Sequence, residues 1–307
     1  MANGPSRRVC AIRSARRLTL SLSLLVVPAL LVAARSDWFS WWWLPLLWVA
    51  QTFGITGISS AAHEAVHSHL FYRPSLERLF GRLTHGIMLL NHDVHRRYHL
   101  IHHANTGTDK DSEGVFDFDD LQSVGAYMRY LTRWALPPSP LHVLNWRVGA
   151  AAVRGRPTAL GPIMRRQALA GFVVPMLMLG TLMAWVIADP VGALVAGFLP
   201  LFCIAPVYGY VTAVPEHFGL ADQEFSTRNI RTWPVTQFLV WNFNLHAVHH
   251  RNPHLHFSLL PGSVGRSIAP SANGYLRFHL DLLRNILAAR RGQPTPVAGP
   301  ERLGART

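Results

Sequence analysis

Four uncharged apolar stretches restrict what this chain can fold into more than any other feature of its 307 residues. They cover residues 18–34, 41–62, 168–188 and 191–214, and only Asp189 and Pro190 separate the last two. Each is close to the roughly 20 residues that a helix needs to cross a bilayer. Soluble helices that are apolar on every side are rarely this long or so regularly paired. The sequence therefore predicts an all-α integral membrane protein with four transmembrane helices in two hairpins.

Basic residues predict the orientation of these helices. Several arginines precede the first stretch, whereas the loop after it carries only Arg35 beside Asp37. Cytoplasmic flanks of membrane helices are enriched in Lys and Arg, so residues 1–17 are expected to form a basic cytoplasmic leader. With four crossings, residues 63–167 and the chain after residue 215 lie on the same side, and both are rich in arginine. We expect a multi-pass protein of the cytoplasmic membrane with both termini in the cytoplasm.

The formal net charge of +13 has the same origin. The arginines are spread over the predicted cytoplasmic flanks, where they suit positive-inside sorting and anionic headgroups, so the lipid bilayer is an expected partner and nucleic acid is not. Cys10 and Cys203 are too few and too far apart for a disulfide framework or a thiolate metal site.

The remaining organisation is simple. Residues 18–265 are expected to form a single membrane-embedded domain. In residues 266–291, leucines at positions 276, 280, 283 and 287 recur at helical spacing among arginines, which predicts an amphipathic helix on the membrane surface. Residues 292–307 are rich in Pro, Gly and Arg, and are predicted to be disordered.

Histidines recur at ligand spacing in three clusters. His63 and His67 stand at i and i+4, and two further clusters repeat the pattern H-x-x-H-H: His99, His102, His103 and His246, His249, His250. On a helix, residues at i, i+3 and i+4 share one face, so each cluster presents its imidazoles together. A lone histidine is more often a satisfied core residue than a ligand, but burying this many imidazoles without chemical purpose is costly. The three clusters are expected to meet around one metal centre on the cytoplasmic side.

The chemistry of that centre has several interpretations. His63-Glu64-x-x-His67 matches H-E-x-x-H, the zinc-protease signature in which the glutamate is a general base, and an intramembrane zinc protease is one alternative. Such a protease needs one ion and three or four ligands, which leaves both H-x-x-H-H clusters unexplained. A metal transporter is another alternative, but it requires polar or ionisable residues along an ion path inside the spans, and the four stretches contain no Asp, Glu, Lys, Arg or His. So many imidazoles suit two transition-metal ions, although imidazole binds zinc, copper, nickel and iron alike.

A redox metal pair at the mouth of an apolar bundle is well placed to oxidise a hydrocarbon whose head group stays near water. Breaking an unactivated C–H bond calls for dioxygen chemistry, which metal cofactors supply and side chains do not. The clusters, with Glu216-His217-Phe218-Gly219 before the third one and Trp241-Asn242 leading into it, resemble the three histidine boxes of the membrane fatty acid desaturase superfamily. The resemblance covers roughly residues 40–265.

This resemblance implies a non-haem diiron oxidase with four spans below a cytoplasmic helical cap that carries the boxes. It also implies the iron ligands, which are His63, His67, His99, His102, His103, His217, His246, His249 and His250. Two polar residues are expected to orient ligand histidines through hydrogen bonds. One is Asp111, in the acidic stretch after the second cluster, and the other is Asn242, four residues before His246.

The implied reaction is the O2-dependent introduction of a double bond into a fatty acyl chain or similar lipid. A hydroxylase or ketolase of the same superfamily, acting on a lipid or a natural-product precursor, is the alternative, because the outcome depends on how the substrate carbon is held. The acyl group would arrive as an acyl lipid, an acyl-CoA or an acyl-carrier protein. Residues 1–17 are too short for a fused electron-transfer domain, and no nicotinamide or flavin fingerprint is present. Electrons are therefore expected from an external ferredoxin-like carrier and its reductase.

Overall fold

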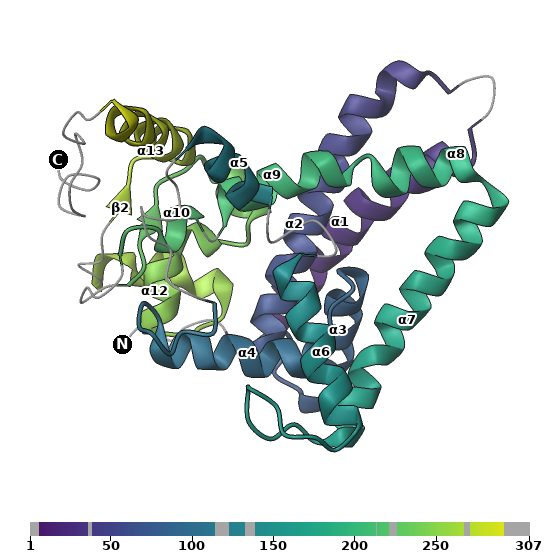
Figure 1. Ribbon diagram of the computed structural model, residues 1–307, viewed down its shortest axis with the longest axis horizontal. Coiled ribbons are helices and arrows are strands. Elements are labelled where there is room, and N and C mark those ends of the chain that lie inside the picture. The colour runs from purple at the N-terminus through teal and green to yellow at the C-terminus, as the bar shows by residue number, and fades with distance from the viewer. Residues whose placement is uncertain are drawn as a thin grey trace. The chain divides into compact units, whose positions relative to one another are not determined.

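The computed structural model describes residues 6–35, 39–113, 123–132, 139–212, 214–220, 226–266 and 271–291, which are mostly helical (Figure 1). The chain divides into two compact units. The first comprises Met1–Tyr98 with Ala135–Ala205, and the second comprises His99–Trp134 with Pro206–Thr307. Two helices run from one unit into the other: α4 (His92–Asn105) and α9 (Leu201–Val211).

In the described residues of the first unit, all regular elements are helices, joined by turns and short loops. Its elements are α1 (Arg7–Ala33), η1 (Trp41–Trp43), α2 (Leu44–Val66), α3 (Pro74–Ile87), α6 (Pro140–Val153), α7 (Arg165–Ala188), α8 (Pro190–Ala193) and η3 (Leu194–Phe198). Along the chain, α1 packs on α2 and α2 on α3, and α7 then packs against both α3 and α6. Arg7–Arg17 of the predicted leader are helical and continue directly into the first apolar stretch.

Among the described residues, three helical stretches are long and apolar enough to cross a membrane: Arg7–Ala33, Arg165–Ala188 and Pro190–His217. They contain three of the four predicted spans. The remaining prediction, residues 41–62, falls on η1 and α2, and α2 has 23 residues. Its apolar character is diluted by polar side chains that bond to nearby backbone: Thr52 Oγ1 donates to Trp48 O at 2.8 Å and Thr56 Oγ1 to Thr52 O at 2.8 Å.

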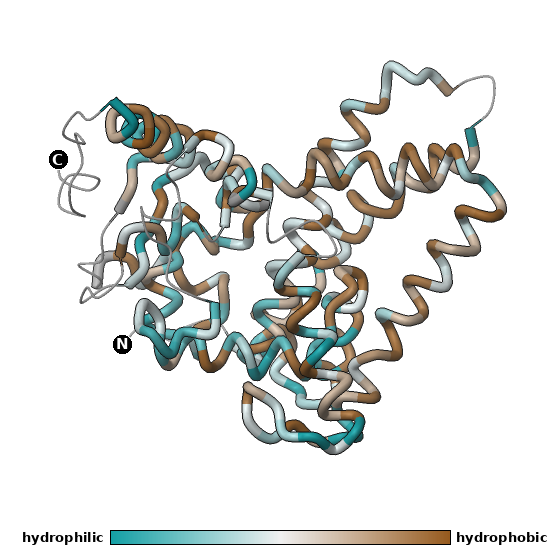
Figure 2. The backbone as a smooth tube through the Cα atoms, in the orientation of Figure 1, coloured by the Kyte–Doolittle hydropathy of each residue, from teal (hydrophilic) through white to brown (hydrophobic). Residues whose placement is uncertain are grey.

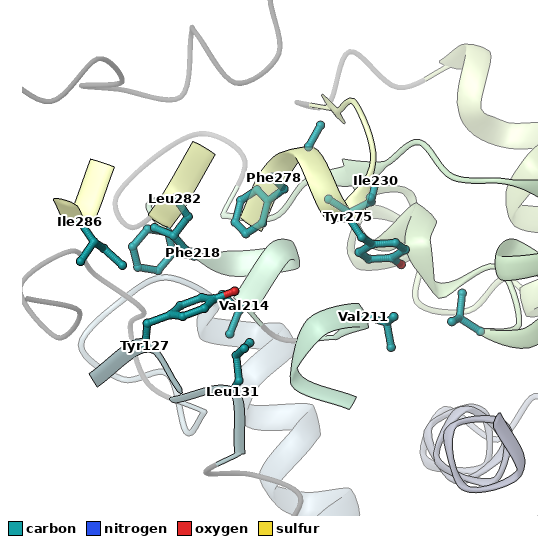
Figure 3. Packing of buried hydrophobic residues seen from close by; sticks show 12 residues of the cluster. Tyr127, Leu131, Val211, Val214, Phe218, Ile230, Tyr275, Phe278, Leu282 and Ile286 are labelled. Atoms are coloured by element: carbon teal, nitrogen blue, oxygen red, sulfur yellow. The ribbon is translucent and has the colours of Figure 1, made fainter. Parts of the chain in front are cut away.

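The second unit packs short elements around one apolar core. They are α5 (Val124–Thr132), α10 (Val214–His217), β1 (Asn229–Ile230), α11 (Pro234–Leu239), η4 (Phe243–Leu245), α12 (His246–Arg251), η5 (Phe257–Arg266), β2 (Ser271–Ala272) and α13 (Tyr275–Arg290). The two short strands pair in parallel, with Ile230 opposite Ala272. Figure 3 shows Tyr127 of α5 and Phe278 of α13 packed into this core with Phe218.

The predicted amphipathic helix corresponds to α13. Phe278, Leu282 and Ile286 are buried in the core of the second unit, whereas Leu276 and Leu280 on another side of the helix are exposed. Figure 2 shows apolar and polar residues interspersed along α13. The predicted disordered tail, residues 292–307, lies outside the described residues.

A buried carboxylate closes the turn that follows His67. Glu77 on α3 accepts hydrogen bonds from the backbone N–H groups of Leu70, Phe71 and Tyr72 at 3.2, 2.5 and 2.6 Å. Tyr72 has a φ of 56°, a left-handed conformation that costs energy in a residue other than glycine. Glu77 therefore holds a strained turn beside the first histidine pair.

Replacing Glu77 with alanine is expected to lower the thermal transition of the detergent-solubilised protein. Three backbone N–H groups would lose their acceptor, and leaving even one of them buried and unpaired costs about 2 kcal/mol. Differential scanning fluorimetry measures the shift. Arg78→Ala, at the neighbouring exposed position of α3, is the matched control, and equal transitions for the two variants would contradict this role of Glu77.

Candidate metal centre

The two H-x-x-H-H clusters lie on short helices of matching design. The second predicted cluster occupies the last two turns of α4, and the third begins α12 at His246. Each helix places its three imidazoles on one side, as the spacing predicts. The second unit contains most of the predicted ligands: His99, His102, His103, His217, His246, His249 and His250.

One group of four imidazoles comes together inside the second unit. The candidate ligand atoms of His102, His217, His246 and His250 all lie within 4.8 Å of one another. Nε2 of His246 lies 2.9 Å from Nε2 of His217 and 3.0 Å from Nε2 of His250. These nitrogens converge on a common point.

A second group lies beside the first. Nε2 of His103 lies 3.0 Å from Nε2 of His99 and 3.2 Å from Nε2 of His249. The His103 ring also stacks on the His250 ring of the first group, with centroids 4.1 Å apart and planes 16° apart. The second unit therefore holds two adjoining imidazole groups.

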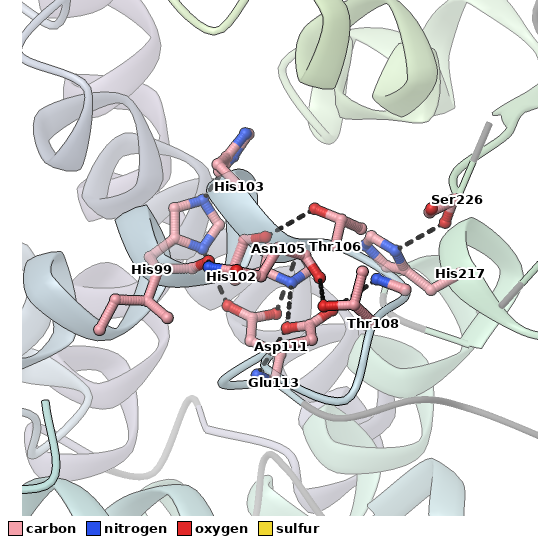
Figure 4. Close-up of polar contacts among 12 residues, drawn as sticks. His99, His102, His103, Asn105, Thr106, Thr108, Asp111, Glu113, His217 and Ser226 are labelled. Carbon is pink, nitrogen blue, oxygen red and sulfur yellow. Dashed lines mark hydrogen bonds and ion pairs between the residues drawn. The ribbon is translucent and has the colours of Figure 1, made fainter. Parts of the chain in front are cut away.

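The Nδ1 atoms of His99, His102 and His217 point away from these groups toward hydrogen-bond acceptors (Figure 4). Nδ1 of His99 lies 2.9 Å from Glu113 Oε1, Nδ1 of His102 lies 2.8 Å from Asp111 Oδ1, and Nδ1 of His217 lies 3.3 Å from the Ser226 carbonyl oxygen. Carboxylate and carbonyl oxygens only accept, so each Nδ1 carries the proton and donates it. In a neutral imidazole this places the lone pair on Nε2, the atom that faces the other histidines.

Nε2 of His102 is the clearest indication that these groups could hold a cation. It is buried, and among the described residues it has no hydrogen-bond partner. Its closest carboxylate oxygen, Oε2 of Glu113, is 3.9 Å away. A buried acceptor without a donor is unfavourable, and a cation at the point where the Nε2 atoms converge would satisfy it. The donor set, neutral imidazole nitrogen, suits iron, zinc, copper or nickel.

Burial favours the neutral, metal-binding form of two of the predicted ligands, His246 and His250, whereas His102 differs. Burial, with the neighbouring imidazoles, lowers the pKa of His246 and of His250 well below the usual value, so both are neutral at physiological pH. For His102, burial also lowers the pKa, but the Glu113 carboxylate and the hydrogen bond to Asp111 together outweigh it, and the net shift is upward. The two carboxylates therefore stabilise positive charge at this imidazole.

Three asparagines hold α12 in place. Val248 N donates to Asn229 Oδ1 at 3.3 Å, and Asn244 Nδ2 donates to the Ile230 carbonyl at 2.9 Å. The side chain of Asn242 donates through Nδ2 to the Phe257 carbonyl at 3.0 Å, and its predicted role in orienting a ligand histidine stays a prediction. Asn242 also takes a left-handed conformation, with φ of 62°, at the entry to η4. Its spacing from His246 gave no sign of the hydrogen bond to the backbone of Phe257.

Two further acidic residues border the groups. Glu113 lies in the same acidic stretch as Asp111, but only Asp111 was predicted to orient a ligand histidine. Glu216 was not predicted to contribute, and its Oε1 lies 3.7 Å from Nδ1 of His246. Its position next to His217 in the sequence is the signal that could have identified it.

His63 and His67 belong to the first unit, at the C-terminal end of α2. Their ring centroids lie 5.0 Å apart, so the i, i+4 spacing brings the pair together. His142 of the same unit is a satisfied core residue: its Nδ1 lies 2.7 Å from Ser139 Oγ, and its Nε2 lies 2.9 Å from the Met88 carbonyl.

Comparisons with known proteins identify the family. The sequence model of the fatty acid desaturase family matches residues 13–263. A curated relative is the sn-1 acyl-lipid omega-3 desaturase (ferredoxin) of Nostoc sp. (strain 36), to which the chain is 26% identical over 115 residues. That alignment covers 35% of this chain and 32% of the relative, so the chain spans about a third of the length of the curated relative that it matches.

Proposed function

We propose that this chain, which belongs to the fatty acid desaturase family, is a membrane oxidase that uses O2 and two non-haem iron ions to introduce a double bond into an acyl chain. The observation that carries the proposal is the pair of adjoining imidazole groups in the second unit. In His99, His102 and His217 the Nδ1 proton is donated to an outward acceptor, and the Nε2 atoms within each group lie close together. Two adjoining sets of neutral imidazoles suit a two-metal centre.

We assign the first iron to the group that contains His102, His217, His246 and His250. The second iron would be held by His99, His103 and His249. The resemblance to the three histidine boxes supports His63 and His67 as its further ligands. Under this assignment both H-x-x-H-H clusters contribute to each iron.

Bound iron would supply the activation of O2 that side chains cannot provide. The protein's own residues prepare the ligands. Asp111 and Glu113 each accept an Nδ1–H, which fixes the orientation of His102 and His99 and keeps their Nε2 lone pairs available. The burial of His246 and His250 keeps both imidazoles neutral.

We propose that α2 is the fourth membrane crossing and that the histidines form part of a cytoplasmic cap. A helix of the length of α2 extends about 34 Å, enough for a hydrocarbon core of about 30 Å. The arginines before the first span support a cytoplasmic N-terminus. An even number of crossings then places the metal centre and the C-terminus on the cytoplasmic side.

We propose an acyl lipid as the substrate and a ferredoxin-like protein, with its reductase, as the electron donor. The Nostoc relative is named as an acyl-lipid desaturase that uses ferredoxin, and the likeness of this chain to it supports both assignments. The net charge of +13 would favour an acidic carrier, because complementary charge speeds the encounter of two proteins.

Product analysis tests the proposed reaction. Expression in a host of defined lipid composition, followed by mass spectrometry, is expected to show acyl chains lighter by the mass of two hydrogen atoms. Products heavier by one oxygen atom would instead identify a hydroxylase. The matched control is the same chain with His249 and His250 both replaced by alanine, which is expected to leave the host lipids unchanged.

A further inference from the structure

The second unit exposes an apolar surface that the metal centre does not use. Trp233, directly before α11, is 81% exposed, Val235 and Phe238 on α11 are 68% and 43% exposed, and no residue of this helix is buried. Single exposed apolar residues are common, but a short helix with no buried residue and three large apolar side chains in solvent needs a partner.

The chain segments that lead into α11 and α13 are hydrogen-bonded to each other. Arg231 N, two residues before Trp233, donates to the Ala272 carbonyl at 2.9 Å, and α13 begins three residues after Ala272. Leu276 in the first turn of α13 is 63% exposed, and Leu280 one turn later is 43% exposed. We call Trp233, Val235, Phe238, Leu276 and Leu280 the α11–α13 patch.

Positive charge surrounds this patch. Arg231 is exposed, and the side chains of Arg277 and Arg284 on α13 are 67% and 71% exposed. Asp281 is the only acidic residue in the sequence between Ser226 and Arg291. A surface with this charge balance complements an anionic surface.

We propose that the α11–α13 patch rests in the interfacial layer of the bilayer, with its apolar side chains at the boundary of headgroups and acyl chains and its arginines on anionic headgroups. Trp is enriched at this depth of the membrane, and helices with apolar and basic sides lie in the interface plane. The first unit contains helices able to cross a membrane, so a bilayer adjoins the protein at all times. The patch would thus turn one identified face of the second unit toward lipid.

A fluorescent label at Val235 tests the proposal in the full-length protein. Cys10 and Cys203 are first replaced by alanine, and Val235→Cys is labelled with an environment-sensitive dye in nanodiscs that contain phosphatidylglycerol. Doxyl lipids labelled near the headgroup are expected to quench this dye at least about twofold, with little effect from aqueous iodide. Asp109→Cys, an exposed position elsewhere in the second unit, is the matched control and is expected to show the reverse.

Two outcomes would overturn the proposal. Iodide quenching at position 235 equal to that at position 109 would place the patch in water. Protection from both quenchers that appears only on adding ferredoxin, or only at two chains per disc, would identify a protein as the occupant. Quenching of the dye does not depend on bound iron or on catalytic turnover, so its result is independent of whether the proposed desaturation is correct.

Discussion

Replacing His249 and His250 together with alanine is expected to remove most of the bound iron and to abolish acyl-chain desaturation. His250 Nε2 lies 3.0 Å from His246 Nε2 in the first group, and His249 Nε2 lies 3.2 Å from His103 Nε2 in the second. The double variant therefore takes one proposed ligand from each iron. Elemental analysis of purified protein is expected to give about two irons per parent chain and far fewer in the variant.

His254→Ala is the matched control for this change. His254 follows the same helix, is exposed and belongs to neither imidazole group. Its replacement is expected to leave the iron content unchanged. If the parent chain instead holds about one zinc, which the double variant keeps and His63→Ala loses, the H-E-x-x-H interpretation would replace the diiron one.

Local periodicity made much of this architecture predictable. Uncharged runs predicted α1 and α7 as apolar helices because hydropathy depends on the segment alone. The H-x-x-H-H spacing likewise predicted the shared faces of α4 and α12, since i, i+3 and i+4 fix the geometry within one helix.

Irregularities of the helices inside the predicted spans were not predictable, because they depend on tertiary structure. The fourth stretch is not one regular helix: its described residues form α8, the π-helical η3, α9 and α10. Pro200 and Pro206 lack the N–H that a continuous helix needs. The sequence does not show which residues adopt the irregular helical conformation around these prolines. In α2, Gln51 Nε2 donates to the Ala196 carbonyl at 2.9 Å, a partner far away in the sequence.

Some contacts around the histidines were likewise predictable from the sequence, and others were not. Asp111 was identifiable because it follows His102 closely and a carboxylate is a common partner of a ligand imidazole. Asn229 was not, since its contact with Val248 depends on the path of β1 past α12. For Asn242, nothing in the sequence indicated the hydrogen bond to the Phe257 carbonyl, fifteen residues further along the chain, and its predicted role beside a ligand histidine stays a prediction.

Replacing Asp111 with alanine is expected to weaken metal binding about 10- to 100-fold. The change removes the acceptor of the His102 Nδ1–H, a 2.8 Å hydrogen bond between two side chains that are only 1% and 2% exposed. It also removes a carboxylate that raises the pKa of His102 and so favours positive charge there. Without it, the imidazole loses its fixed orientation beside His217, His246 and His250.

Competition of the purified protein against a chelator measures this loss as the chelator concentration that removes half of the iron. Asp111→Asn keeps an oxygen acceptor without the charge, so its midpoint is expected to fall between those of the parent and of Asp111→Ala. Asp109→Ala, two residues away and exposed, is expected to match the parent. A purely structural role for Asp111 would lower the thermal transition of the metal-free protein without this ordering of midpoints, whereas a role in orienting His102 requires it, because the three side chains differ mainly in what they offer to one Nδ1–H.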